Sequence, residues 1–156
     1  MKNKEHGVAI IEFALILPLL LILTFIATEF GRAIYQYNTI TKSVRDAARY
    51  LSMQDPTIKV NDLGKITIAR NLVVYGNPNP GIGDLPLAIG LKLENVPAAN
   101  IQWNIKGANP SINVVTISVT GYKFKSLISN AFGVVFGDSK GDISFGEISA
   151  TMRAQS

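Results

Sequence analysis

The sequence predicts an α+β fold in which a long N-terminal helix packs against a small antiparallel β-sheet head. Residues 8–27 form an apolar run, and apolar residues continue at helical spacing as far as Leu51. Further along the chain, apolar and polar residues alternate in several short stretches, which is typical of strands with one buried face. About 100 residues follow the helix, enough for one modest core.

The apolar run is interrupted only by Glu12, Pro18 and Thr24. Its length in a helix is about 30 Å, which matches the hydrocarbon thickness of a bilayer. We therefore predict a transmembrane helix over residues 8–28, in which Pro18 produces at most a kink. Close to the membrane the bias in basic residues between the two sides is weak, so their count alone does not settle the orientation. Because residues 1–7 are too short to be translocated as a domain, we expect them inside the cell and the head outside.

Two alternative interpretations start from the same residues. A cleavable secretory signal also begins with a basic segment and an apolar region, but that region is usually about 7 to 15 residues long. Here the run is longer, and Glu12 lies in its first turns. The second alternative is a plain signal anchor that holds an unrelated domain at the membrane.

The helix is predicted to continue as an amphipathic extension over residues 29–54. Asp55 and Pro56 end it, because the residue before a proline is driven out of the helical region. The predicted helix thus covers residues 8–53. Its apolar face contains Phe30, Ile34, Tyr37, Ile40, Val44, Ala47, Ala48 and Leu51, and its polar face contains Arg32, Gln36, Lys42, Arg45, Asp46 and Arg49.

The predicted extracytoplasmic α+β head covers residues 55–156. A second helix is expected over residues 62–75, capped by Asn61 or Asp62, and a glycine- and proline-rich surface loop follows at residues 76–84. Strands are expected at residues 101–106, 111–121 and 142–153, paired antiparallel in one sheet that both helices cover.

An apolar stretch at residues 125–136 is predicted to be a short helix or an irregular segment. An apolar cluster overlaps it, formed by Phe124, Leu127, Phe132 and Phe136. We expect this cluster to belong to the core. The alternative is a docking patch for neighbouring proteins.

Composition excludes several classes of site. The chain has no cysteine, and its single histidine, His6, precedes the apolar run. The acidic residues show no motif spacing, and Lys and Arg are not clustered with aromatic residues. We therefore expect no catalytic residues, no metal site, no cofactor and no nucleic-acid partner.

Gly7, the apolar residues that follow it, and the pair Glu12 and Phe13 resemble the processing signal of type IV pilin-like proteins. The resemblance implies that residues 1–7 are a cytoplasmic leader, which a prepilin peptidase removes by cutting between Gly7 and Val8. It also implies a pilin-like fold. The residue after the glutamate is often tyrosine in major pilins, so Phe13 favours a minor component.

Further motifs resemble the TadE-like family of tight-adherence (Flp, type IVb) pilus systems. They are EFALILP from Glu12, EFGRA from Glu29, ARNLVVYGNPNP at residues 69–80 and ISATMRAQS at the C-terminus. The family implies a minor pilin-like protein of the inner membrane that acts in assembly of adhesive pili. Its implied partners are the prepilin peptidase, other pilins and minor pilins, an inner-membrane assembly platform and the lipid bilayer.

Two alternative functions remain beside this reading. A type II secretion pseudopilin would share the same leader and span. A signal-anchored extracytoplasmic enzyme or binding domain would share only the anchor.

A carboxylate at position 12 has a physical use if the leader is removed. Cleavage would create an ammonium on Val8, one helical turn from Glu12 and on the same face. In a low dielectric, opposite charges attract strongly and an unpaired charge is costly. We therefore hypothesise that the amine of a partner satisfies Glu12, so that Glu12 and Phe13 set the register between subunits. The alternative is that Glu12 reaches the cytoplasmic interface and has no partner.

Overall fold

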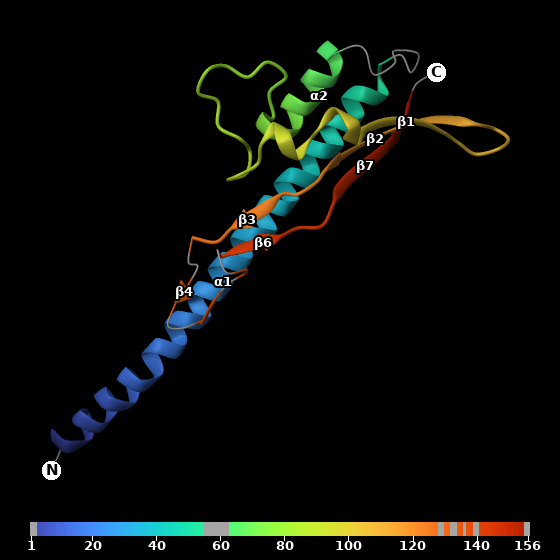
Figure 1. Ribbon diagram of the computed structural model, residues 1–156. Helices are drawn as coiled ribbons and strands as arrows, with labels where there is room; N and C mark the ends of the chain where they lie inside the picture. Colours follow the sequence, from blue (N-terminus) through green and yellow to red (C-terminus); the bar gives the residue numbers. More distant parts are fainter. Residues whose placement is uncertain are drawn as a thin grey trace.

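The computed structural model describes residues 3–54, 63–127, 130–131, 134–135, 137–138 and 141–154. Helix α1 (Asn3–Ser52) is a single helix of 50 residues, about 75 Å long at the standard rise. Figure 1 shows its N-terminal half projecting from the head, while the C-terminal half lies against it. The predicted continuous helix is confirmed, and Pro18 does not interrupt it. The predicted stop at Asp55 and Pro56 lies outside the described residues.

Helix α2 (Leu63–Tyr75) packs against the C-terminal half of α1. It buries Ile66, Ala69, Val73 and Val74, and the predicted helix over residues 62–75 is confirmed. Its end is set by Gly76, whose φ of 68° lies in the left-handed region that glycine adopts without strain. The predicted caps, Asn61 and Asp62, lie outside the described residues.

The main sheet has three antiparallel strands in the order β1-β2-β7. Strand β1 (Ile101–Lys106) pairs with β2 (Ile112–Val119), and β7 (Ile148–Arg153) pairs with the other edge of β2. Two short 3₁₀ turns, η1 (Leu93–Asn95) and η2 (Ala98–Asn100), lead into β1. One face of this sheet packs on α1, so the predicted α+β arrangement of helix and antiparallel sheet is confirmed. The shared core contains Ile40, Val44, Ala47, Leu51, Ile66, Val73, Leu91, Val115, Ile117 and Tyr122.

The prediction of one strand over residues 142–153 is wrong. Strand β6 (Asp142–Ser144) pairs with β3 (Lys123–Lys125) in a separate two-stranded sheet, whereas β7 belongs to the main sheet. The chain changes sheet at Phe145, whose ring lies against Tyr37 and Tyr122 at centroid distances of 5.5 and 5.7 Å. Packing of this ring against α1 fixes the break between the two strands.

The stretch at residues 125–136 contains paired strands where it is described, and the predicted short helix is wrong for those residues. Strand β4 (Asn130–Ala131) pairs antiparallel with β5 (Val134–Val135). We call β3, β4, β5 and β6 together the ribbon. In Figure 1 the ribbon follows α1 away from the main sheet, and β4 lies nearest the N-terminal half of the helix.

The apolar cluster around Phe124 is divided between two environments. Phe124 is fully buried, which confirms the core prediction for this residue. Leu127 is 72% exposed, so the core prediction is wrong for it. Phe132 and Phe136 lie outside the described residues.

Candidate functional site

The predicted cleavage site lies near the N-terminal end of α1, far from the head (Figure 1). Gly7 is exposed, and a side chain added there would meet nothing within 4 Å. Val8 is 56% exposed. The bond between these two residues is thus open to an external protein, although its cleavage stays a prediction.

Glu12 and Phe13 are also exposed on the projecting half of α1. Val8 and Glu12 are four residues apart, which places them on one face of the helix, a turn from each other. Among the described residues, Glu12 has no hydrogen-bond or ion-pair partner. Any group that pairs with its charge therefore comes from outside the described side chains.

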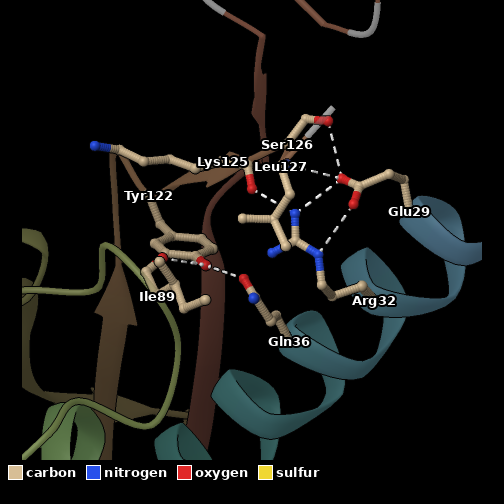
Figure 2. Close-up of polar contacts among 8 residues, drawn as sticks. All are labelled: Glu29, Arg32, Gln36, Ile89, Tyr122, Lys125, Ser126 and Leu127. Atoms are coloured by element: carbon tan, nitrogen blue, oxygen red, sulfur yellow. Dashed lines mark hydrogen bonds and ion pairs between the residues drawn. The ribbon is translucent and has the colours of Figure 1, made fainter. Parts of the chain in front are cut away.

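A second carboxylate, Glu29, lies where α1 meets the head and is 6% exposed. Figure 2 shows that it receives donors from two directions. Arg32, one turn along α1, donates from Nη2 to Oε2 at 2.8 Å and from Nε to Oε1 at 3.3 Å. From the ribbon side, Ser126 Oγ and the Leu127 backbone N–H donate to Oε2 at 2.9 and 3.2 Å. We call Glu29, Arg32, Ser126 and Leu127 the latch.

Arg32 also bonds directly to the head. Its Nη2 donates to the carbonyl oxygen of Lys125 at 2.6 Å, and its guanidinium carbon lies 4.3 Å from the centre of the Phe124 ring. A cation over an aromatic face is attracted by the ring quadrupole. Arg32 therefore joins the carboxylate of Glu29 to the backbone at the end of β3.

The electrostatics of the latch favour the charged form of Glu29. Burial alone would raise the pKa of this carboxyl, but hydrogen bonds from Arg32 and Ser126, the positive charge of Arg32 and the Leu127 N–H outweigh it. The pKa of Glu29 therefore lies below its ordinary value. A low pKa means that the folded protein holds the ionised carboxylate more tightly than the unfolded chain does.

One turn beyond the latch, Gln36 makes a buried contact with Tyr122. The Tyr122 hydroxyl donates to Gln36 Oε1 at 2.7 Å and lies 3.1 Å from the carbonyl oxygen of Ile89 (Figure 2). Burial raises the pKa of Tyr122, partly opposed by the charge of Arg32. The hydroxyl therefore stays protonated. Through it, the segment that leads into β3 is bonded both to α1 and to the loop before η1.

The sequence prediction of the buried face of α1 is wrong near the latch. Phe30, Ile34 and Tyr37, predicted as apolar face, are 67%, 45% and 43% exposed. Glu29 and Gln36 are buried instead, each at 6%. Their spacing in the sequence could have indicated this burial. Steps of four, three and four residues connect Glu29, Ala33, Gln36 and Ile40, which places them on one face of the helix.

A groove of about 520 Å³ lies between α1, α2 and the loop that follows α2. Its lining includes Tyr35, Lys42 and Asp46 from α1 together with Leu72 and Leu87. Among the described residues, no group of three His, Asp or Glu side chains is placed to hold a metal ion.

The projecting half of α1 has the properties of a membrane span. Its most apolar stretch has a mean hydropathy of 2.7, and none of that stretch is buried inside the protein. Large apolar side chains are exposed there on every side, among them Ile10 at 68%, Leu15 at 75% and Leu23 at 65%. Length and composition are compatible with a single-pass membrane anchor.

Comparison with protein families gives one match. The model of the family described as TadE-like protein matches residues 7–49, which lie within α1. The resemblance inferred from the sequence is thereby confirmed for this helix, and the match supports a pilus-associated protein of the tight-adherence type. Comparison with curated proteins and with solved structures gives no match.

Proposed function

We propose that this chain, whose residues 7–49 match the model of the TadE-like family, is a minor pilin-like protein that acts in assembly of tight-adherence pili. It inserts with its N-terminus in the cytoplasm and its head outside. A prepilin peptidase removes residues 1–7, and the mature protein joins other pilins at the inner-membrane assembly platform through α1.

The division of α1 into two halves is the observation that carries the proposal. The head covers one face of the C-terminal half, where Ile40, Val44 and Leu51 are fully buried. Most of the N-terminal half exposes its apolar residues; only Ile22 and Phe25, on the face towards the head, are half-buried. This half can therefore lie in lipid first and pack against helices of other subunits later, with no rearrangement of the head.

Glu12 would give such packing a defined register. An unpaired carboxylate at membrane depth costs about 2.5 kcal/mol or more, so a subunit that supplies an amine gains from pairing with it. The amine of Val8 after cleavage is the matching group, on the same chain or on a neighbour. Pairing with a neighbour fixes how far one helix is displaced along the next.

Cleavage is tested by N-terminal sequencing of the full chain extracted from membranes of cells with and without a prepilin peptidase. We expect a mature chain that starts at Val8 only when the peptidase is present. A chain that starts at Met1 in both cell types would show that residues 1–7 are not a processed leader. The same experiment separates the proposal from a secretory signal, which would remove the whole apolar run.

The register role is tested with Glu12→Ala and Glu12→Gln, measured by pilus yield and by crosslinking to other pilins. We expect both variants to insert and to be cut after Gly7, but to give fewer pili and less crosslinking. Glu94→Ala is the control, because Glu94 is exposed on the head. Normal piliation with both Glu12 variants would rule out the register role while leaving the cleavage result intact.

A type II secretion pseudopilin remains the second candidate, because it would share the leader and the span. The family match at residues 7–49 favours the tight-adherence type. Deletion of the chain distinguishes the two, since loss of adhesive pili without loss of protein secretion is expected only for the first.

A further inference from the structure

The latch fixes the height of the ribbon along α1. The Leu127 N–H and the Ser126 hydroxyl are bonded to Glu29, which is the second residue after the apolar run at residues 8–27. At the standard helical rise, Glu29 lies about 3 Å beyond the end of that run. The ribbon is thus attached to the helix at the boundary between its apolar and amphipathic parts.

The apolar run is no longer than the bilayer requires. Residues 8–27 span about 30 Å, which is the full hydrocarbon thickness, so none of the run can be left in water without exposing part of the membrane core to polar residues. The polar headgroup regions add about 5 to 8 Å on each side. The latch therefore lies inside the outer headgroup region, and tilting of the helix would only bring it deeper.

The chemistry of the ribbon fits this position. The side chain of Leu127 is 72% exposed even though its backbone N–H is held by Glu29. The sequence from residue 127 to residue 136 contains no charged residue. Lys123 and Lys125, both exposed, precede it in β3. Apolar residues beside basic ones are the composition of segments that lie in a membrane interface.

The backbone of the ribbon also meets the demands of such a site. Strands β4 and β5 pair with each other through Asn130 and Val135, and through Ala131 and Val134. The pairing satisfies the amide and carbonyl groups on the facing edges of the two strands, and water in the headgroup region can satisfy those on the outer edges. In Figure 1, β4 lies closer to the N-terminal end of α1 than β3 and β6 do, which is the direction of the bilayer.

We propose that the ribbon is a second membrane contact, in which Leu127 and the paired strands β4 and β5 rest against the outer leaflet of the bilayer beside α1. The partner is the lipid surface itself. The head is then held against the membrane in one orientation, with the β1–β2 end of the sheet pointing away from it. This inference depends on the membrane span of α1 and is independent of cleavage and of any role in pili.

The absence of cysteine from the chain allows the proposal to be tested by single-site spin labelling. Leu127→Cys in the full chain carries the label, in vesicles of phosphatidylethanolamine and phosphatidylglycerol. Two residues of matched exposure serve as controls: Leu15, 75% exposed in the span, and Ile105, 73% exposed on β1. The measurement is the ratio of label relaxation by oxygen, which concentrates in lipid, to relaxation by a water-soluble nickel complex.

We expect the ratio at position 127 to be several-fold above that at position 105 and below that at position 15. A ratio equal to that at position 105 would place the ribbon in water and overturn the proposal. Protection of position 127 from both reagents would show that another protein covers it, which also overturns the proposal. A low ratio at position 15 would reject the span and the ribbon contact together.

Discussion

Glu12 and Glu29 are two carboxylates on the same helix in opposite situations. Glu29 is buried and accepts hydrogen bonds from Arg32, Ser126 and Leu127. Glu12 is exposed and has no partner among the described residues. A carboxylate that the chain itself satisfies serves the fold, whereas one that is left open on an apolar helix requires a partner from elsewhere.

The two halves of α1 differ in the same way, in how far the head buries their side chains. In the C-terminal half, the buried residues recur at three- and four-residue spacing, as a helix against one head requires. In the N-terminal half, all described side chains are exposed from Gly7 to Leu21, and only Ile22 and Phe25 are half-buried. The first pattern describes a completed contact within one chain, and the second describes an apolar surface that the described head leaves open, compatible with a membrane anchor.

The largest expected effect comes from one substitution made in each half. Leu51→Ala removes a fully buried side chain, and we expect it to lower the free energy of unfolding by about 2 to 5 kcal/mol. Leu15→Ala changes a residue that is 75% exposed in this chain, so the stability of the head should hardly change. Thermal unfolding of the full chain in detergent, followed by the near-ultraviolet signal of Trp103, measures both.

This pair of variants tests the comparison directly. Equal destabilisation by Leu51→Ala and Leu15→Ala would mean that the two halves share one folding unit. Loss of helix insertion by Leu15→Ala with an unchanged head would instead agree with separate roles.

A smaller effect is expected at the latch. Glu29→Ala removes the acceptor of Ser126 and Leu127 and leaves the charge of Arg32 without its carboxylate. Loss of hydrogen bonds to a charged group costs about 1.5 to 3 kcal/mol. We expect this loss in the local stability of the ribbon, measured by hydrogen exchange of the amides that pair β3 with β6, with much less change in α2. Glu94→Ala, at an exposed glutamate of the head, is the control, and an equal effect of both variants would show that the latch does not hold the ribbon.

The sequence predicts the large elements of the fold because their patterns are long and local. Helix α1 has an apolar run followed by periodic spacing, β1 alternates over its six residues, and β2 alternates from Val115 to Val119. Strands β3 to β6 are only two or three residues long, too short to show a period. Their pairing depends on contacts with α1 that no local pattern records.

For a related reason, the sequence predicts the residues of the N-terminal motif but not the latch. Gly7, Val8, Glu12 and Phe13 form a motif that is legible without a structure, and their role stays a prediction. Glu29 lies in the EFGRA motif, but nothing in the motif indicates that it is buried. Its partners, Ser126 and Leu127, are 97 and 98 residues away in the sequence. Burial of a charged residue depends on such distant partners, so helical spacing alone assigns it to the polar face.

The smallest expected effect is the pH dependence of the stability that Glu29 gives to the latch. Because the pKa of Glu29 is lowered in the folded protein, its stabilising contribution is complete above the ordinary glutamate value of about 4.3 and is lost as the pH falls through the lower, folded value. Glu29→Gln keeps the shape but cannot ionise. We therefore expect wild type to exceed Glu29→Gln in ribbon stability at pH 7, and the gap to shrink below pH ~4. Hydrogen exchange of the β3–β6 amides in both proteins measures it, and a gap that widens with acid would contradict a Glu29 stabilised in its charged form.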